Sequence, residues 1–388
     1  MNYTNTIFNQ LLELLPRNRF EQFVGQHKAD RYVKKMSCWN QLGIMLYAQA
    51  KGKESLREIE KSLGTRPEKL YHLGINSIAK STIAEANRDR PSQIYESLFY
   101  ELLKLCKGLS GEKKFNFDNP LKALDSTTIT LCLKLFPWAK FSKTKGAFKL
   151  HCLFDIRNQI PEFIVESDWH GNDLAVAKNN SFVFSPDSIT VMDRAYIDFR
   201  WFYEKIHKKK AYFVVRLKKK IKYFVLENLP IFEEGVVSDQ KIVLCGEKTI
   251  ENYPEDVRLV TYYDKETKKI YQFVTNNFEL SAKTIADIYK ARWQIELFFK
   301  WIKQHLKIKT FLGTSKNAVM TQIWIAMIYY LLLSYIKAKT KFPSSLLSLT
   351  WILAEVLMDR ASIIDILGLK LNQLHLIRIR DDTQLALC

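Results

Sequence analysis

The feature that most constrains the fold is a change of hydrophobic periodicity near residue 116. Before this point, segments such as 38–50 and 92–106 place apolar residues at helical spacing, and Ser81 is expected to open a further helix over 81–90. After it, four segments rich in β-branched and aromatic residues follow one another closely, which favours strands: LKALDSTTITLCL, AFKLHCLFDI, PEFIVESDWH and SITVMDRAYID. The polar stretch 107–120 between the two regions is typical of a linker. We therefore expect a helical N-terminal domain followed by a domain built on a β-sheet.

The order of the elements after residue 116 restricts the topology further. Short turns containing Asn158 and Pro161 separate the second and third strand segments, so the first three strands are expected to form an antiparallel meander. The segment 199–210 has the pattern of a helix and leads into the strand AYFVVRLKK, which predicts a strand-helix-strand unit with a parallel pair. Three strands followed by a helix and a strand are the opening of an RNase H-like fold. The predicted fold class is α/β, with a mixed sheet flanked by helices.

The rest of the chain adds elements to this core. Lysine-rich strand candidates between 220 and 272, with DKET (264–267) as a hairpin turn, predict an inserted, mostly β subdomain. Ser281 is suited to cap a long helix that follows. Two short helices in 55–74 could form a helix-turn-helix, although any small helical bundle produces the same pattern. We divide the chain into five segments: a helical N-terminal domain (1–115), the first part of the α/β core (116–219), the inserted β subdomain (220–272), the second part of the core (273–341) and a helical C-terminal region (342–388).

Charge and cysteine usage narrow the class of protein. The formal net charge of +18 indicates a polyanionic partner, either nucleic acid or an anionic membrane surface. The six cysteines are dispersed without a C-x-x-C pair, which suits neither a zinc site nor a disulfide framework and favours a reducing compartment. The first twenty residues lack the regions of a signal peptide, so we expect a cytoplasmic protein.

One segment has nearly the length of a membrane span. Residues Val319 to Ile336 are mostly apolar, with lysines near both ends. Thr321, Gln322 and Ser334 interrupt the apolar run, and a basic amphipathic helix precedes it. We therefore predict a buried core helix rather than a membrane span, and no membrane partner.

The segment YKARWQIELFFKWIKQ, residues 289–304, places charged groups within a strongly apolar stretch. At about 100° per residue, four polar side chains fall within an arc of roughly 60° on a helix: Tyr289, Arg292, Glu296 and Lys303. The rest of the circumference is too apolar for an ordinary surface helix, which predicts an embedded helix with one polar stripe facing a groove. A solvated stripe with an Arg292–Glu296 ion pair is the alternative, and it leaves the tyrosine and lysine unexplained.

Two aspartates supply partners for Glu296. Asp125 and Asp193 lie at or near the ends of the apolar strands LKALD and SITVMD, where a buried strand delivers its last side chain to the rim of the sheet. An isolated aspartate at a strand end commonly only caps a turn, so the pair gains meaning from the third carboxylate. Three carboxylates suit Mg²⁺ or Mn²⁺, and two such ions would serve an in-line phosphoryl displacement. Arg292, Lys303 and Tyr289 would then hold phosphates next to the metal.

These residues match the motifs of a known family. The helix fits the pattern Y-x₂-R-x₃-E-x₆-K at every spacing, the first aspartate lies in LDSTTI, and the second lies in DRAYIDF with Arg194 and Tyr196. The chain thus resembles bacterial insertion-sequence transposases of the Asp-Asp-Glu (DDE) type, in the group with the Tyr-Arg-Glu-Lys signature, insertion sequence family four. The resemblance covers about 115–340, and its motifs are specific. It implies that Arg194 and Tyr196 bind DNA or its phosphates.

The resemblance implies a function. It implies an RNase H-like catalytic core with a mostly β insertion between the second aspartate and the glutamate, and two Mg²⁺ ions per active site, with Mn²⁺ as a substitute. It also implies binding of terminal inverted repeats, release of a 3′-OH, a DNA hairpin, and strand transfer into target DNA by a cut-and-paste mechanism in the bacterial cytosol or nucleoid. A homodimer on paired double-stranded DNA ends is expected, with 1–115 binding the ends and 342–388 available for dimerisation.

Weaker candidates and alternatives remain open at this stage. His151 could face the groove, although a strand histidine is more often structural, and three further side chains near the motifs are candidate DNA contacts: Lys149, Trp293 and Lys300. Some aromatic of the inserted region could stack on a flipped base, and the sequence does not distinguish among Tyr223, Phe224, Tyr262 and Tyr271. The alternative functions are a catalytically inactive DNA-binding relative, acting as a repressor of transposition or as a domesticated protein, and an RNase H-like nuclease without end specificity.

Overall fold

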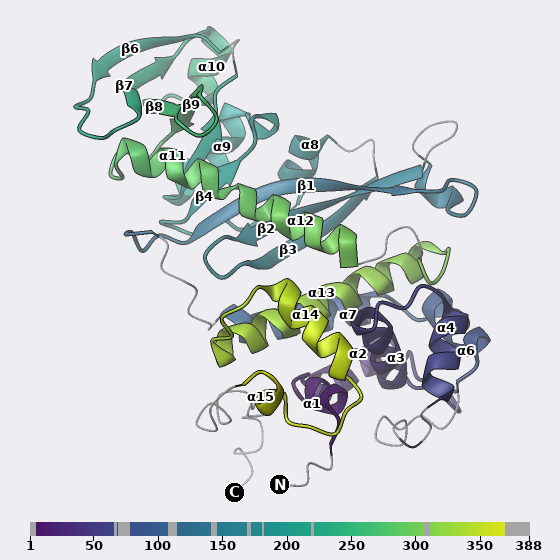
Figure 1. The fold of residues 1–388 in the computed structure, drawn as a ribbon. Helices are drawn as coiled ribbons and strands as arrows, with labels where there is room; N and C mark the ends of the chain where they lie inside the picture. Colours follow the sequence, from purple (N-terminus) through teal and green to yellow (C-terminus); the bar gives the residue numbers. More distant parts are fainter. Residues whose placement is uncertain are drawn as a thin grey trace, which may run out of the picture. The chain divides into compact units, whose positions relative to one another are not determined.

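The structure is a computed structural model that describes residues 5–65, 68, 78–107, 115–140, 146–168, 172–180, 182–218, 221–305 and 311–368. The chain divides into two compact units (Figure 1). The helical unit comprises Met1–Gly111, Thr130–Gly146 and Trp301–Cys388, and the α/β unit comprises Glu112–Ile129 and Ala147–Lys300.

One mixed sheet organises the α/β unit. In the described part of the chain it has nine strands in the order β3-β2-β1-β4-β5-β9-β8-β7-β6. The strands are β1 (Leu121–Leu131), β2 (Gly146–Asp155), β3 (Ile160–Asp168), β4 (Ile189–Met192), β5 (Tyr212–Arg216), β6 (Tyr223–Asn228), β7 (Val236–Leu244), β8 (Val257–Asp264) and β9 (Lys269–Thr275). The helices of this unit are α8 (Asp173–Asn179), α9 (Phe199–Lys205), α10 (Glu247–Asn252), α11 (Ala282–Ala291) and the first part of α12 (Trp293–His305), with short 3₁₀ turns η3 (Arg194–Tyr196) and η4 (His207–Lys209).

The first five strands agree with the predicted element order. β2 and β3 pair antiparallel, and β1 is the neighbour of β2 on its other side. β4 pairs in parallel with both β1 and β5, and α9 connects β4 to β5. The predicted strand-helix-strand unit with a parallel pair is therefore confirmed.

The strands predicted for the insertion are hydrogen-bonded into this same sheet. β9 pairs antiparallel with β5, with Val215 opposite Val274, and β8, β7 and β6 follow outward as antiparallel neighbours. The predicted turn DKET closes the β8–β9 hairpin, where the Asp264 carboxylate accepts a hydrogen bond from the Glu266 N–H at 2.9 Å. The strands before and after residue 220 belong to one continuous sheet, so the sheet itself marks no boundary there. The subdomain boundaries at 220 and 272 therefore stay predictions.

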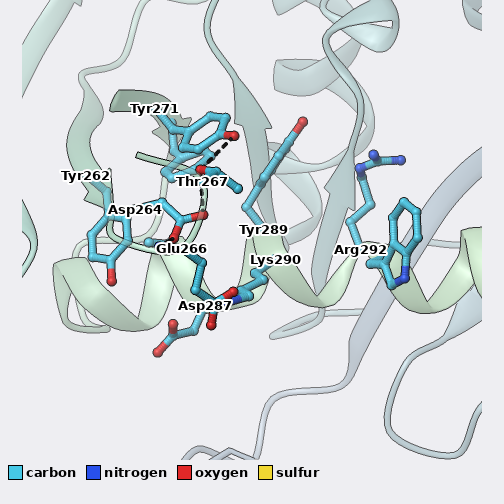
Figure 2. A pocket seen from close by; sticks show the side chains of 12 residues that line it. Tyr262, Asp264, Glu266, Thr267, Tyr271, Asp287, Tyr289, Lys290 and Arg292 are labelled. Carbon is cyan, nitrogen blue, oxygen red and sulfur yellow. Dashed lines mark hydrogen bonds and ion pairs between the residues drawn. The ribbon is translucent and has the colours of Figure 1, made fainter. Parts of the chain in front are cut away.

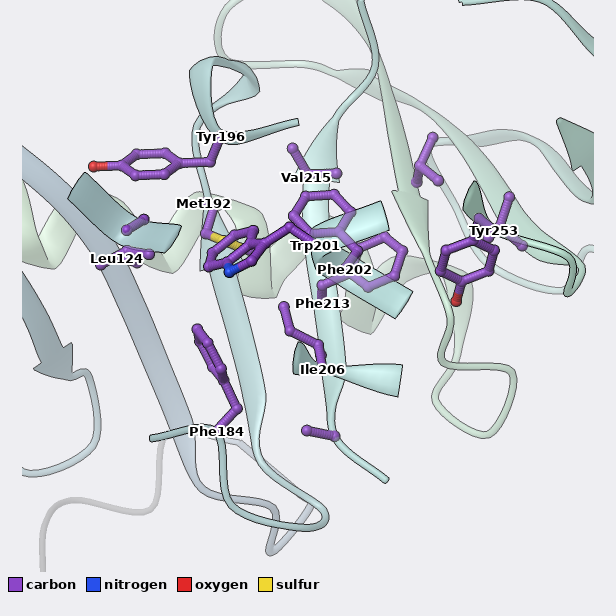
Figure 3. Packing of buried hydrophobic residues seen from close by; sticks show 14 of the residues in the cluster. Leu124, Phe184, Met192, Tyr196, Trp201, Phe202, Ile206, Phe213, Val215 and Tyr253 are labelled. Atoms are coloured by element: carbon purple, nitrogen blue, oxygen red, sulfur yellow. The ribbon is translucent and has the colours of Figure 1, made fainter. Parts of the chain in front are cut away.

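The two faces of the sheet are covered by different helices. On one face, β-strand side chains form a hydrophobic cluster with α9, in which the rings of Phe202 and Phe213 stack at 4.5 Å (Figure 3). Because successive side chains of a strand point to opposite faces, Phe273 lies on the face opposite to its neighbour Val274, a member of that cluster. The Phe273 ring packs on Tyr289 of α11, with ring centres 4.7 Å apart. α9 and α11 therefore cover opposite faces.

The helix that carries the charged stripe is interrupted. Ser281 caps α11 as predicted, accepting a hydrogen bond from the Thr284 N–H. At Arg292, however, the backbone makes i−3 hydrogen bonds, from the Arg292 N–H to the Tyr289 carbonyl at 3.2 Å and from the Ile295 N–H to the Arg292 carbonyl at 3.1 Å. The prediction of one continuous helix is therefore wrong. A single tight turn shifts the phase by only about 20°, from roughly 100° to 120° per residue, so hydrophobic periodicity does not reveal it.

The helical unit is built around α13. Its described helices are α1 (Ile7–Glu13), α2 (Arg17–Gln26), α3 (Cys38–Ala50), α4 (Leu56–Gly64), α6 (Lys80–Asp89), α7 (Gln93–Lys107), α13 (Lys316–Thr340), α14 (Leu346–Val356) and α15 (Ile363–Ile366), with a short 3₁₀ turn η2 (Pro137–Ala139). α13 packs against α3, α6, α7 and α14 (Figure 1). Among the described residues it is the helix whose length and composition would allow a membrane crossing, and 94% of its apolar window is buried. The predicted buried core helix is confirmed.

The predicted N-terminal helices are present, with one shifted boundary. α3, α4 and α7 occupy the expected segments, and Ser55 caps α4 through the Glu58 N–H. α6 begins at Lys80 rather than after Ser81. Residues 66–67 and 69–77 lie outside the described residues, so the helix-turn-helix stays a prediction.

Candidate active site

Asp125 and Asp193 follow directly on the last paired residues of two neighbouring parallel strands. Leu124 lies opposite Met192 in the β1–β4 register, and both side chains belong to the cluster on the α9 face. Alternation along β1 therefore directs Asp125 to the other face, which α11 covers. Asp193 follows the last residue of β4 and accepts a hydrogen bond from the Arg194 N–H at 2.7 Å, which caps η3.

The strand segment predicted around Asp125 is confirmed, but Asp125 does not lie at its end. β1 continues to Leu131, so Asp125 lies inside the strand and not at its end. The residues after it, STTITL, are rich in the β-branched types that favour strands, and they extend β1 beyond the point where β4 stops. Asp125 is consequently placed at the end of its neighbour β4, which brings it close to Asp193 despite the continuing strand.

Arg292 connects the sheet to Glu296. One of its terminal nitrogens donates to Asp125 Oδ2 at 2.8 Å, and the other donates to Glu296 Oε1 at 2.6 Å. The Arg292 side chain is only 17% exposed and that of Asp125 is 19% exposed. The Arg292–Glu296 pair expected on the helix is thus present, but it belongs to a partly buried contact with the sheet. This arrangement counts against the alternative of a solvated surface stripe.

Burial and neighbouring charges shift the titration of Asp125. Burial, together with the negative charges of Asp193 and Glu296, raises the pKa of the Asp125 carboxyl to about 6. The Ser126 N–H and the Arg292 guanidinium act in the opposite direction and lower this pKa. Asp193 and Glu296 therefore lie close enough to Asp125 to influence it electrostatically.

The carboxylates have the chemistry of a hard-cation site, with a guanidinium between two of them. In the described part of the chain, no three His, Cys, Asp or Glu side chains are arranged closely enough to hold a metal ion as they stand. Three carboxylates face a single arginine, which leaves excess negative charge, and carboxylate oxygens are the ligands that Mg²⁺ and Mn²⁺ prefer. The donor set therefore fits a divalent cation, provided that Arg292 releases the two oxygens it now contacts.

A cavity of about 420 Å³ adjoins Arg292 (Figure 2). It lies between the β8–β9 hairpin and the end of α11, and its lining includes Tyr262, Tyr271, Phe273, Tyr289, Trp293, Asp264, Glu266, Asp287, Lys290 and Arg292. Two of the four aromatic residues left open by the sequence, Tyr262 and Tyr271, line this cavity, whereas Tyr223 and Phe224 lie on β6. The contribution of Phe273 was missed, although its i, i+2 spacing from Tyr271 places both rings on one face of β9.

The other predicted DNA-binding residues lie in different environments. Arg194 is exposed on η3, whereas Tyr196 is 1% exposed and belongs to the hydrophobic cluster (Figure 3). Trp293 is 57% exposed at the start of α12, and Lys300 is exposed on the same helix. Lys303 also lies on α12, in the part of the helix that belongs to the helical unit.

His151 and Lys149 belong to a separate polar cluster on β2. His151 is buried and its Nε2 is 2.7 Å from the Ser167 hydroxyl, and burial lowers the pKa of the imidazole to about 4. Lys149 forms an ion pair with Asp173 at 2.8 Å. These contacts connect β2 to β3 and to α8. Both side chains thus have a structural role, which is the alternative to a DNA contact.

Comparison with known proteins identifies the family to which this fold and carboxylate cluster belong. Residues 116–332 match the transposase DDE domain, and residues 3–76 match a domain of unknown function, DUF4372. The chain belongs to the family of DDE transposases, which confirms the resemblance inferred from the motifs. Membership implies polynucleotidyl transferase or nuclease chemistry in DNA transposition, dependent on a divalent metal.

Three relatives are named as transposases. The chain is 30% identical over 270 residues to one named for insertion sequence element IS5377 of Geobacillus stearothermophilus, covering 69% of this chain and 70% of that protein. It is 31% identical over 285 residues to the transposase y4zB of Sinorhizobium fredii (72% and 78% covered), and 27% identical over 307 residues to one named for element IS4SA of Synechocystis (77% and 80% covered).

A solved structure was also matched. A cryo-EM structure of the piggyBac transposase synaptic complex with hairpin DNA aligns with 95% of this chain and 82% of its own, at a TM-score of 0.47 and 10% identity.

Proposed function

We propose that this DDE transposase binds the terminal inverted repeats of an insertion sequence, releases a 3′-OH at each end, and joins the ends to target DNA by cut-and-paste, with a hairpin intermediate. The observation that carries the proposal is the meeting of Asp125, Asp193 and Glu296 in the α/β unit, where each carboxylate affects Asp125 and Arg292 links two of them. The strands β1 to β5 with α9, together with residues 273–341 that carry Glu296, are the proposed RNase H-like core, and residues 220–272 are the proposed insertion.

Each side chain has a proposed role in this reaction. Asp125, Asp193 and Glu296 would hold Mg²⁺, with two ions per site and Mn²⁺ as a substitute. When bound, such ions supply an activated hydroxyl and stabilise the leaving oxygen of a phosphoryl displacement. Arg292 and Tyr289 lie beside the carboxylates and would orient DNA phosphates, and exposed Arg194 would add a further phosphate contact.

The cavity beside Tyr289 suits an unpaired base better than a phosphate. Its walls combine the aromatic rings of Tyr262, Tyr271 and Phe273 with the carboxylates of Asp264 and Glu266. Aromatic rings stack on any base, whereas carboxylates repel a phosphate. We propose that a base displaced at the transposon end enters here, which selects Tyr262 and Tyr271 among the four candidate aromatics.

The remaining assignments extend the proposal to the whole protein. The helices of 1–115 would bind the DNA ends, the region 342–388 would contribute to a homodimer on paired ends, and target DNA would be captured by the same complex in the bacterial cytoplasm. The net charge of +18 supports binding to double-stranded DNA through its phosphates. We expect affinity to fall by about 10³ to 10⁵ between 50 and 200 mM salt if about six to ten phosphates are contacted.

A cleavage assay tests the function. Purified protein is incubated with Mn²⁺ and a duplex carrying the inverted repeat that flanks its gene. Glu296→Gln is tested alongside, with the control Glu204→Gln on α9, whose exposed carboxylate pairs with Lys208. We expect nicking and hairpin products with the wild type and the control, and none with Glu296→Gln. Binding without cleavage by the wild type would instead identify an inactive DNA-binding relative, and cleavage of unrelated duplexes equally well would identify a nuclease without end specificity.

A further inference from the structure

We propose that Arg292 is a positioning residue that makes metal binding depend on DNA binding. In the free protein its guanidinium occupies one oxygen of Asp125 and one of Glu296, and a DNA phosphate that draws Arg292 away releases both oxygens for the cation. The inference rests on the proposed function, because it assigns the same carboxylates to metal and the same arginine to phosphate.

The first support is that Asp125 has both oxygens engaged. Oδ1 accepts a hydrogen bond from the Ser126 N–H at 2.8 Å, and Oδ2 accepts one from Arg292 at 2.8 Å. The backbone contact is fixed by the strand, whereas the arginine is a side chain that can rotate. A cation that binds Asp125 together with Glu296 therefore competes with Arg292 for space and meets its positive charge.

The second support is that Arg292 is incompletely satisfied where it lies. Its Nε is buried and has no hydrogen-bond partner among the described residues, although its two terminal nitrogens are bonded. A buried donor without a partner is unfavourable. A phosphate can accept two parallel hydrogen bonds from a guanidinium, including one from Nε, so a phosphate offers Arg292 a more complete set of contacts.

The third support is that Arg292 lies next to the place proposed for DNA. It lines the cavity together with Tyr289 and Trp293 (Figure 2), and its guanidinium carbon is 5.8 Å from the centre of the Tyr289 ring. Rotation of the side chain would thus exchange a carboxylate contact for a contact with the phosphate of the nucleotide whose base enters the cavity. The tight turn at residue 292 separates α11 from α12 at this residue.

The inference predicts a reciprocal coupling. If releasing Arg292 is a condition for cation binding, DNA and cation each raise the affinity of the protein for the other by the same factor. Removing the guanidinium abolishes the condition, so an Arg292→Gln protein binds the cation more tightly without DNA. Arg292→Lys keeps one charge but cannot bridge two carboxylates, and its behaviour falls between the two.

The experiment measures Mn²⁺ affinity of the full-length protein from the electron paramagnetic resonance signal of free Mn²⁺. The DNA probe is a precleaved duplex that ends at the transposon terminus, so that end cleavage does not intervene. For the wild type we expect the duplex to strengthen Mn²⁺ binding by tenfold or more. For Arg292→Gln we expect tighter Mn²⁺ binding than the wild type without DNA, less than threefold further gain with DNA, and a larger rise of Tm on adding Mn²⁺.

The outcomes separate the two proposals. A wild type that cleaves its ends, but binds Mn²⁺ equally well with and without the duplex, overturns the coupling and leaves the function standing. A wild type that neither cleaves nor binds Mn²⁺ under any condition overturns the proposed function itself. The Tm without metal shows whether Arg292→Gln is folded. If it is not folded, the Mn²⁺ affinities of the wild type and of Arg292→Lys, each with and without the duplex, test the coupling.

Discussion

Two arginine–carboxylate contacts in the α/β unit look alike in distance and differ in what they leave unsatisfied. Arg258 on β8 makes a two-point contact with Asp239 on β7, at 2.8 and 2.6 Å, and its third nitrogen donates to the Asn277 carbonyl at 3.2 Å. Both side chains are at most 5% exposed. Arg292 divides its donors between two carboxylates and leaves Nε without a partner among the described residues.

This difference distinguishes the structural ion pair Arg258–Asp239 from the candidate functional site around Arg292. Every nitrogen of the Arg258 guanidinium has an acceptor within the fold, so no ligand is needed to complete the contact. The group around Arg292 has three carboxylates and one cation, and its Nε has no acceptor among the described residues. A bound metal ion would balance the excess negative charge, and a bound phosphate would accept the hydrogen bond from Nε. Incomplete satisfaction of a buried charge cluster is thus a better indicator of function than the short distances that the two contacts share.

The largest effect is expected from Asp125→Asn. This change removes a proposed metal ligand, and we expect DNA cleavage to fall at least about 10³-fold, since loss of an essential charged group typically costs several kcal/mol in the transition state. The free energy of unfolding without metal should be unchanged or higher, because the buried carboxylate is replaced by a neutral group. Cleavage rates and urea denaturation check the two halves, and a marked loss of stability would show that Asp125 is structural.

Asp239→Asn should show the opposite pattern. It leaves the buried Arg258 without its charged partner, so we expect a loss of about 3–5 kcal/mol in the free energy of unfolding. Because neither residue contacts the carboxylate cluster, the cleavage rate per folded molecule should stay near that of the wild type. Urea denaturation gives the first quantity and an active-site titration gives the second.

The pH dependence of Asp125 is expected to have opposite signs for stability and for metal binding. Its pKa is about 6 in the folded chain and about 3.9 when unfolded, so the folded state binds this proton more tightly. The stability that this group contributes is complete below pH 3.9 and is lost as the pH rises through 6. Mn²⁺ needs the ionised form, and its affinity should fall about tenfold for each pH unit below 6.

Asp125→Asn is the control for both measurements. The difference in urea midpoint between the wild type and this variant should change between pH 5 and pH 7. The neighbouring Asp193, Glu296 and Arg292 are present in both proteins, which isolates the contribution of Asp125. An identical pH dependence of the two proteins would contradict the shifted pKa.

The smallest effect is expected at the surface of the cavity. Lys290 and Glu266 form an ion pair at 2.7 Å, with side chains that are largely exposed. Solvent screens such pairs, so Glu266→Gln should change the free energy of unfolding by less than about 1 kcal/mol. A loss comparable to that of Asp239→Asn would mean that exposure does not distinguish the pairs in this unit.

Local patterns in the sequence predicted the elements, and contacts between distant segments account for what was missed. The strands through β5, the cap at Ser281 and the DKET turn depend on residues that are close in sequence, and the structure has all of them. The pairing of β5 with β9 joins residues some sixty positions apart, and strand composition alone does not indicate which edge accepts another strand.

The candidate site likewise combines features predicted by local patterns with features that depend on contacts between distant segments. The motif spacing selected the carboxylates and the Arg292–Glu296 pair, because both depend on fixed positions in a strand or a helix. The bond from Arg292 to Asp125 spans 167 positions and depends on the packing of a helix on the sheet. The cavity likewise requires the β8–β9 hairpin and α11 together, and therefore had no signal in either segment alone.

The cap at Asp193 has a consequence for the history of such elements. Its carboxylate begins η3 by accepting from the Arg194 N–H, and an asparagine caps a turn nearly as well as an aspartate. A copy in which Asp193 has changed to asparagine would lose a proposed metal ligand and still fold. We expect such inactivated copies to persist in a genome as intact proteins that occupy the same DNA ends, and so to restrain the active copies from which they arose.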